Sequence, residues 1–219
     1  MRLIALILLL ILFPVLLLVS LLVFIDLGFP ILYRDRRSGK NFHHFNIIKF
    51  RTMTDGDGLP VTMDNDRRVT SIGKFLRNMR LDELPQLVNI INGEINFVGP
   101  RPESVSIVDS HRLSFSYLEH IKPGVTDISS IILKNESKIL EQHGSKMEYY
   151  INEILPVKTS ISESYINNLS LWHRFVIVIA TLLSLVSHVS GMKLTRTVFY
   201  IDDTQFCNKL NNIIGIEIF

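Results

Sequence analysis

The centre of this chain is governed by the stretch Leu81-Asp82-Glu83-Leu84-Pro85-Gln86-Leu87-Val88-Asn89-Ile90-Ile91-Asn92-Gly93. Its apolar side chains recur at the spacing of one helix face, and Asn92-Gly93 is a common helix stop. The apolar positions are Leu84, Leu87, Val88 and Ile91. The pattern predicts a helix that starts near Asp82, with Pro85 in the first turn, where its missing N–H does no harm. Asp82 and Glu83 would then lie at the positive end of the helix dipole.

A rigid element follows at once, in the stretch Asn96-Phe97-Val98-Gly99-Pro100-Arg101-Pro102. It predicts a short strand and then a loop in which two prolines flank Arg101. A stiff loop lowers the entropy lost when a guanidinium binds an anion, and the arginine fork can bind two phosphate oxygens. The alternative is a rigid surface loop without a ligand. Further on, Lys122-Pro123-Gly124-Val125-Thr126 predicts a Pro-Gly turn.

Upstream of the acid pair, the sequence predicts a hairpin and a second helix. Residues 29–33 and 45–50 have strand-like composition, and residues 38–41 between them are typical of a turn. Residues 54–68 are rich in Asp and Gly and predict a loop. Residues 69–79 predict a helix with one core-facing side. That side would carry Ile72, Phe75, Leu76 and Met79.

The N-terminus is a continuous apolar run from residue 3 to residue 25, interrupted by Pro14 and Ser20. As a straight helix it would reach roughly 34 Å, against a hydrocarbon core of about 30 Å, so it predicts a membrane segment. A cleaved signal peptide is disfavoured, because the run is long and no small-residue cleavage site ends it. Pro14 at its centre predicts a kink or a break. A re-entrant geometry is favoured and a spanning one stays open.

The charges that flank this run predict its orientation. The basic residues that follow it place the rest of the chain in the cytoplasm under the positive-inside rule. They are Arg34, Arg36, Arg37, Lys40, Lys49 and Arg51. A second apolar stretch, residues 175–186, is too short to span a bilayer and predicts a core or interfacial helix. We therefore expect a membrane segment at 1–25, a cytoplasmic domain at 26–190 and a tail at 191–219 whose role the sequence does not indicate.

Composition excludes several classes of protein. The 219 residues include 23 Lys and Arg, 21 Asp and Glu, and one Cys, and 47% are hydrophobic. This balance excludes a disordered tail and a strongly cationic nucleic-acid-binding arm. A lone cysteine excludes a disulfide framework and a multi-thiolate zinc site. One domain with a packed core is expected, with an α+β fold that is mainly helical, contains a short β-hairpin, and has interfacial helices later in the chain.

Five motifs between Lys49 and Thr126 stand in one order. They are Lys49-Phe50-Arg51-Thr52-Met53, Leu76-Arg77, Leu81-Asp82-Glu83-Leu84-Pro85-Gln86-Leu87, Val98-Gly99-Pro100-Arg101-Pro102 and Lys122-Pro123-Gly124-Val125-Thr126. Together they resemble the bacterial sugar transferase family, small monotopic polyprenol-phosphate phosphoglycosyl transferases. The resemblance runs from the apolar run to about Leu183.

The resemblance implies an enzyme that moves a sugar 1-phosphate from a UDP-sugar to undecaprenyl phosphate, releasing UMP and starting capsule, O-antigen or related glycan assembly. It implies that Asp82 is the nucleophile, which holds a covalent phosphosugar, and that Glu83 is its partner acid. Mg²⁺ is the implied cofactor, with Asp82 and Glu83 as its ligands. The implied diphosphate-binding residues are Lys49, Arg51, Arg77 and Arg101.

The resemblance also implies the setting. The chain would lie at the inner leaflet of the bacterial cytoplasmic membrane, with Phe13-Pro14 at the family's break in a re-entrant helix. It departs from the family pattern at Asp127, where Gly is common, and at His173 and Arg174, where an acid is often found. The second departure keeps open an alternative, a catalytically silent membrane-anchored nucleotide-sugar binder or assembly scaffold. The identity of the sugar and the formation of a homo-oligomer are not indicated by the sequence.

Overall fold

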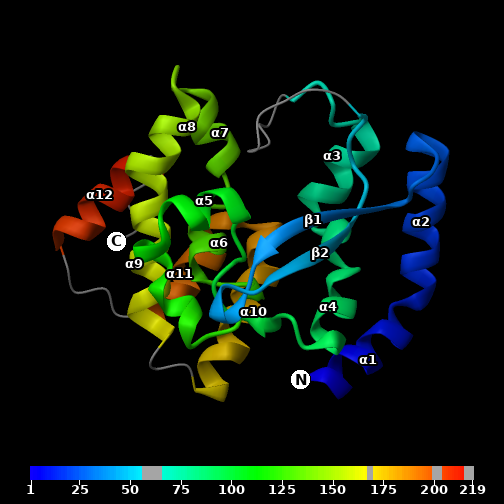
Figure 1. Ribbon diagram of the computed structural model, residues 1–219, viewed down its shortest axis with the longest axis horizontal. Coiled ribbons are helices and arrows are strands. Elements are labelled where there is room, and N and C mark those ends of the chain that lie inside the picture. The colour runs from blue at the N-terminus through cyan, green and yellow to red at the C-terminus, as the bar shows by residue number, and fades with distance from the viewer. Residues whose placement is uncertain (56–65, 167–169, 199–203, 215–219) are drawn as a thin grey trace.

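The computed structural model of this chain describes residues 1–55, 66–166, 170–198 and 204–214, and helices predominate in it (Figure 1). The mainly helical class and the antiparallel hairpin are confirmed. Most of the predicted loop at 54–68 lies outside the described residues. The first elements are α1 (Arg2–Ile11), α2 (Phe13–Leu27), β1 (Leu32–Ser38), η1 (Lys40–Phe42), β2 (His44–Phe50), α3 (Ser71–Asn78), η2 (Leu81–Glu83), α4 (Gln86–Asn92) and β3 (Asn96–Val98).

In the rest of the described chain, the regular elements are helical except for one short strand. Its elements are α5 (Val105–Ser110), η3 (Arg112–Glu119), β4 (Gly124–Thr126), α6 (Ile128–Ile132), α7 (Glu136–Glu141), α8 (Lys146–Tyr149), η4 (Tyr150–Ile154), α9 (Leu155–Ile166), α10 (Leu171–Val186), α11 (His188–Val198) and α12 (Thr204–Ile214).

The N-terminal apolar run forms two helices, α1 and α2, bent by 65° relative to each other. Leu12 lies between them, and Pro14 occupies the first turn of α2, where its missing N–H leaves no helix bond unmade. Within the described residues, no single helix is long and apolar enough to cross a membrane, whereas α1 and α2 reach that length and hydropathy together.

Each of these two helices packs on the body of the protein along one stripe. Ala5 of α1 is buried against Leu87 and Ile90 of α4, and Val19 of α2 shares a buried cluster with Leu76 of α3. The opposite side of both helices exposes large apolar side chains, among them Leu3, Leu10, Leu17, Leu21 and Ile25. The helix pair therefore offers an apolar outer surface that the rest of the chain does not cover.

The hairpin lies slightly later in the sequence than predicted. Strand β1 pairs with β2 in antiparallel register from Leu32 opposite Phe50 to Ser38 opposite His44. The first strand therefore runs through the charged residues that were expected to flank a turn. A sheet ladder needs only backbone groups, so charged side chains do not prevent the pairing, and Arg37 pairs with Asp35 of the same strand and with Glu103.

The predicted helix at 69–79 is confirmed as α3, but its predicted core face is partly wrong. Thr70 caps the helix by accepting a hydrogen bond from Gly73 N at 2.9 Å. Leu76 is fully buried, whereas Phe75 is 55% exposed and Met79 is 45% exposed. The reason is that α3 packs on α2 through a narrow stripe, which covers less than a full helix face.

The predicted helix from Asp82 begins later than expected. Leu81–Glu83 form a 3₁₀ turn, η2, and α4 starts only at Gln86. Pro85 has no N–H to donate, and the turn before it is held by a bond from Leu84 N to Leu81 O instead. The predicted stop at Gly93 is confirmed, with φ at 80°. The predicted start near Asp82 is therefore wrong, and Pro85 lies at the N-cap of α4 rather than in its first turn, while Asp82 and Glu83 precede the N-terminal end of that helix.

A second small sheet was not predicted. Strand β3 pairs in parallel with β4, with Asn96 opposite Gly124 and Val98 opposite Thr126. The predicted Pro-Gly turn is therefore the entrance to a strand. The two strands meet closely, because a Cβ atom on Gly124 would lie 2.2 Å from Gly99 N. This contact fixes the start of the Pro100-Arg101-Pro102 loop.

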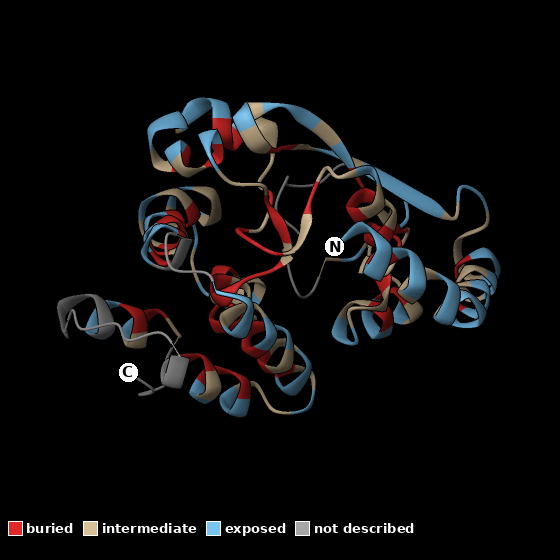
Figure 2. Cartoon of the chain, turned by 90° about the horizontal axis from the view of Figure 1, so that it is seen from below, coloured by how far each residue is buried: buried red, intermediate tan, exposed pale blue. Residues whose placement is uncertain are grey.

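The apolar core is divided between the two halves of the chain, as the buried segments in Figure 2 show. The largest cluster runs from Val98 to Ile213, and two smaller clusters involve α1 to α4, β2 and Ile95. Helix α10 buries Ile177 and Ala180 in the large cluster and exposes Trp172 and Phe175. Met192, Leu210 and Ile213 lie in that same cluster, so α11 and α12 pack with the preceding helices.

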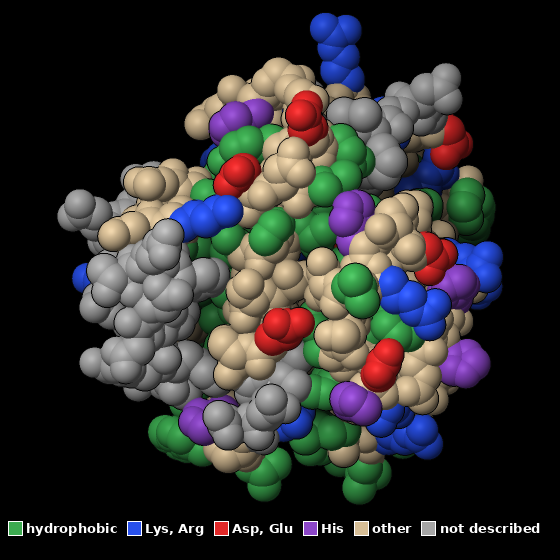
Figure 3. All heavy atoms as spheres, turned by 60° about the vertical axis from the view of Figure 1, so that its left-hand side comes forward, with side chains coloured by type: hydrophobic (Ala, Val, Ile, Leu, Met, Phe, Trp, Pro, Cys, Tyr) green, Lys and Arg blue, Asp and Glu red, His purple; other side chains and the backbone are tan. Residues whose placement is uncertain are grey.

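Charged side chains of both signs are mixed on the surface beside α8, α9 and α12. Figure 3 shows Lys, Arg, Asp, Glu and His side chains scattered among neutral atoms on this face. The pattern agrees with the near balance of 23 basic and 21 acidic residues.

The close contact between β3 and β4 predicts a strong effect of one methyl group. Gly124→Ala should lower the free energy of unfolding by about 2 kcal/mol, because the added Cβ meets backbone atoms that cannot rotate away. Gly144→Ala is the control, since no atom lies within 4 Å of its added Cβ. Thermal and denaturant unfolding in detergent would measure both. Equal stability of the two variants would contradict the close contact.

Candidate active site

The candidate site is built around two consecutive acids on the turn between α3 and α4. Arg80, just before this turn, has a left-handed backbone with φ at 54°, a conformation uncommon for a residue other than glycine. The turn presents Asp82, which is 8% exposed, beside Glu83. Since α4 begins at Gln86, the environment of the two acids is set by side chains rather than by the end of that helix.

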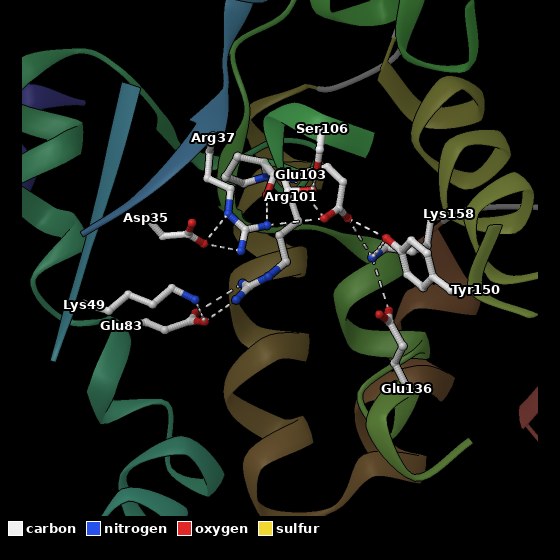
Figure 4. A network of polar contacts seen from close by, with 12 residues as sticks. Asp35, Arg37, Lys49, Glu83, Arg101, Glu103, Ser106, Glu136, Tyr150 and Lys158 are labelled. Carbon is white, nitrogen blue, oxygen red and sulfur yellow. Dashed lines mark hydrogen bonds and ion pairs between the residues drawn. The ribbon is translucent and has the colours of Figure 1, made fainter. Parts of the chain in front are cut away.

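Glu83 is held by three cations, of which Figure 4 shows Lys49 and Arg101. Arg101 binds both carboxylate oxygens, with Nη1 at 3.2 Å from Oε2. Lys49 Nζ lies 3.4 Å from Oε1, and Arg80 Nη1 lies 3.7 Å from Oε2. Burial alone would raise the pKa of Glu83, but Arg101 and Lys49 outweigh it and hold the pKa well below its ordinary value. Glu83 is therefore a permanently ionised carboxylate with its lone pairs engaged.

Asp82 is the opposite case. Its carboxylate makes no hydrogen bond within the described residues. Burial, and then the charge of Glu83, raise the pKa of Asp82 to about 6, although Lys49, Arg77 and Arg101 act in the other direction. The two neighbouring acids therefore have different environments. Glu83 is held in ion pairs, whereas Asp82 is an unpaired carboxylate that is ionised at neutral pH. An unpaired, ionised oxygen is what nucleophilic attack requires.

The predicted basic residues are brought to the acid pair with one exception. The positive charges of Lys49, Arg77 and Arg101 all lie near enough to lower the pKa of Asp82. Arg77 donates from Nε to Thr52 Oγ1 at 2.8 Å, and its guanidinium has no other hydrogen bond within the described residues. Burial lowers the pKa of Arg77 and that of Lys49. Partly unsatisfied, desolvated cations of this kind are suited to an anionic ligand.

Arg51 is the exception. Its guanidinium donates to the carbonyl oxygens of Leu27, Phe29 and Met53 and pairs with Asp55 at 3.0 Å. It therefore connects the end of α2 to the residues that directly follow β2. The structure gives Arg51 partners away from Glu83 and does not bring it to the acid pair.

Arg80 is a site residue that the sequence did not indicate. Besides its contact with Glu83, its Nη2 donates to Ser130 O at 3.3 Å, at the α6 helix. Asp127 caps that helix by accepting a bond from Ser130 N at 2.8 Å, and its charge acts on both Arg80 and Arg101. The only signal in the sequence is a cation two positions before the acid pair, which is too common a pattern to be informative.

Within the described residues, no group of three or more His, Cys, Asp or Glu side chains could hold a metal ion. Mg²⁺ is nevertheless often held by one or two carboxylates together with substrate phosphates and water. Asp82 and Glu83 together supply the two carboxylates that such a site needs. Asp82 is the more open of the two, because the oxygens of Glu83 already bind Arg101, Lys49 and Arg80.

The chain is similar to known sugar transferases. The model of a family described as bacterial sugar transferase matches residues 2–188. A UDP-N-acetylgalactosamine-undecaprenyl-phosphate N-acetylgalactosaminephosphotransferase of Aeromonas hydrophila is 30% identical over 180 residues, 80% of this chain and 40% of the relative. An undecaprenyl-phosphate glucose phosphotransferase of Komagataeibacter xylinus is 33% identical over 185 residues, 80% of this chain and 33% of the relative.

A shorter relative is also similar. A UDP-glucose:undecaprenyl-phosphate glucose-1-phosphate transferase of Caulobacter vibrioides is 32% identical over 180 residues, 80% of this chain and 63% of the relative. The matched region thus spans less than two thirds of the length of each of these relatives. Two of the three names specify glucose and one specifies N-acetylgalactosamine, and all three name undecaprenyl phosphate.

The raised pKa of Asp82 makes a prediction about stability. Between pH 4 and pH 6 the folded protein keeps the proton that the unfolded chain loses, so ionisation of Asp82 destabilises the fold as pH rises. A pKa difference of about 2 corresponds to about 3 kcal/mol, which is an upper limit here because nearby cations lose a counter-charge. Asp82→Asn should therefore raise the free energy of unfolding at pH 7.5 and not at pH 4.

Denaturant unfolding in detergent at the two pH values measures this difference. Asp109→Asn, at an exposed acid of α5, is the matched control and should show no such pH dependence. A variant at position 82 that loses stability equally at both pH values would contradict the electrostatic assignment.

Proposed function

Since this chain belongs to the bacterial sugar transferase family, we propose that it transfers a sugar 1-phosphate from a UDP-sugar to undecaprenyl phosphate and releases UMP. The names of the three relatives support this reaction. The observation that carries the proposal is the unequal acid pair, in which Glu83 is fixed by three cations while Asp82 is unpaired.

The first step is attack by an Asp82 carboxylate oxygen on the β-phosphorus of the UDP-sugar. A bond forms between that oxygen and phosphorus, and the bond from the β-phosphorus to the bridging oxygen breaks. The electron pair of the broken bond leaves with UMP, and the sugar phosphate stays on Asp82 as an acyl phosphate. Two anions must approach each other, so the cations around the acid pair have a direct purpose.

Arg77, Lys49 and Arg101 are the groups we assign to the diphosphate. The positive charges of these three residues lower the pKa of Asp82, so they act at the place where it reacts. Preorganised cations that face the negative charge developing on a leaving group lower the activation barrier of the transfer. Glu83 orients Arg101 and Lys49 toward the place where Asp82 reacts. We assign Glu83 an indirect contribution to chemistry, through these two cations.

In the second step a phosphate oxygen of undecaprenyl phosphate attacks the same phosphorus. The bond to Asp82 breaks, the carboxylate is restored, and the product is a lipid diphosphosugar. The acceptor lies in a bilayer, so the site must be held close to the membrane surface. The exposed apolar side of α1 and α2 supports attachment there, and the basic residues that follow favour the inner leaflet of the bacterial cytoplasmic membrane with the site facing the cytoplasm.

We also propose that Mg²⁺ takes part, held by Asp82, with Glu83 as a second donor. When bound, the ion would neutralise charge on the diphosphate and on departing UMP. Asp82 and the substrate phosphates would supply the oxygens that Mg²⁺ prefers.

The nucleophile is tested by replacing its charge. Purified protein in detergent with undecaprenyl phosphate and a panel of UDP-sugars should release UMP, and Asp82→Asn should lower the rate by at least about a thousandfold. Asp109→Asn should keep the wild-type rate. Without acceptor lipid, intact-protein mass spectrometry should reveal one added sugar phosphate on the wild type and none on Asp82→Asn.

Two outcomes contradict the proposal. UMP release by Asp82→Asn at the wild-type rate, with mass spectrometry excluding deamidation, would remove Asp82 as the nucleophile. A wild-type protein that binds UDP-sugars but releases UMP from none would favour a silent binder or assembly scaffold.

Metal removal is a separate test. EDTA should abolish UMP release and added Mg²⁺ should restore it, because the diphosphate needs a counter-charge beyond the protein's own cations. The midpoint of thermal unfolding without substrate should change little, since the acids are already compensated by Arg101, Lys49 and Arg80. Full turnover in EDTA would show that the cations of the chain suffice.

A further inference from the structure

A second ionic cluster adjoins the candidate site on the far side of Arg101 (Figure 4). Its centre is Glu103, which accepts hydrogen bonds from four donors. Tyr150 Oη lies 2.6 Å and Lys158 Nζ lies 3.3 Å from Oε2, while Arg37 Nη1 lies 3.3 Å from Oε1. The backbone N–H of Ser104 donates to Oε1 at 3.0 Å. All the lone-pair sites that face the protein are therefore used.

The donors come from elements far apart in the sequence. Arg37 lies on β1, Tyr150 begins η4, and Lys158 lies on α9. Backbone contacts add to these side-chain bonds. Ser38 N donates to Glu103 O at 3.2 Å, and Arg37 forms an antiparallel β-bridge with Ser104. Glu103 thus connects the hairpin of the N-terminal half to helices of the C-terminal half.

Glu103 is also a buried charge. Its side chain is 15% exposed. Burial alone would raise the pKa of Glu103, but Lys158 and Arg37 lower it to about 2. The carboxylate therefore stays ionised across the physiological range, and replacing it by an uncharged group would leave two cations without their shared partner.

We infer that Glu103 is a positioning residue of the acid-pair site, which fixes the loop from Pro100 to Ser104 so that Arg101 reaches Glu83 and the substrate diphosphate. This inference rests on the proposed function. Sequence position supports it, because only Pro102 separates Arg101 from Glu103 and a proline leaves the backbone little freedom.

The other end of the loop is also fixed. Gly99 N donates to Thr126 O at 3.1 Å, Gly124 N donates to Pro100 O at 2.9 Å, and Arg174 Nη1 donates to Val98 O at 3.3 Å. The guanidinium of Arg101 itself binds only Glu83 and Val125 O within the described residues. The position of the Arg101 guanidinium is therefore set by the backbone of the loop. Glu103 fixes that backbone on the C-terminal side of Arg101.

Glu103→Gln tests the inference, because it keeps the shape of the side chain and removes its charge. The KM for the UDP-sugar and the Kd for UDP, measured by calorimetry, should each rise about tenfold, the effect of a weakened charge-assisted contact to phosphate. Tyr150→Phe removes one hydroxyl from the same carboxylate and should raise both constants by a smaller factor. Hydrogen exchange of a peptide covering residues 99–104 should become faster in Glu103→Gln.

Glu136→Gln is the matched control. Glu136 pairs with the same Lys158 at 3.2 Å but does not touch Glu103. It should leave KM, Kd and exchange within twofold of wild type. Glu103→Asp, which retains the charge, should recover part of the loss.

The outcomes separate the inference from the proposed function. An active wild type with Glu103→Gln and Tyr150→Phe indistinguishable from it would overturn the positioning role alone. So would equal losses in Glu103→Gln and Glu136→Gln, since these would report general destabilisation. A wild type that neither binds UDP nor releases UMP would overturn the proposed function and the positioning role with it.

Discussion

The ion pair between Glu83 and Arg101 is the interaction on which the site depends. Glu83 belongs to the half of the chain whose small apolar clusters involve α1 to α4, whereas Arg101 opens the half that packs around the large cluster. Arg80 reinforces the same junction by reaching Ser130 from the other side. Because the carboxylate oxygens of Glu83 are engaged by Arg101, the neighbouring carboxylate of Asp82 is the one that has no partner among the described residues. Adjacent acids in one turn can therefore take different tasks without any difference in side-chain chemistry.

The cost of this arrangement is carried by Asp82. A buried carboxylate without a hydrogen bond is unfavourable, and its ionisation opposes folding at neutral pH. The surrounding cations reduce that cost but do not remove it, since burial also lowers the pKa of Lys49 and of Arg77. Charges that are only partly satisfied in the free protein are the ones that gain most when an anionic ligand arrives. Local instability and binding capacity have the same origin here.

Local patterns predicted the local elements. The hairpin, α3, the stop at Gly93 and strand β3 follow from residue type and spacing, and the motifs that carry the family resemblance include five residues that the fold gathers, Lys49, Arg77, Asp82, Glu83 and Arg101. The pairing of β3 with β4 was missed because three-residue strands so far apart have no periodic signal. The late start of α4 and the direction of Arg51 depend on backbone and carbonyl partners that a motif does not specify. The hydrogen bond from Tyr150 to Glu103 has no signal in the sequence, because it arises only from tertiary contact.

The divided core has a further consequence. Each half has its own apolar clusters, and the acid pair and Glu103 lie where the halves meet. The halves are joined there by ion pairs of Lys49 and Arg37 and by the apolar contacts of Phe42 and Phe97. Dissolved salt screens partly buried ion pairs much less than exposed ones, for which the Debye length is about 8 Å at physiological ionic strength. Glu83 and Glu103, at 10% and 15% exposed, are largely out of reach of bulk ions. The alignment of the two halves should therefore withstand changes of ionic strength that weaken ion pairs on the open surface.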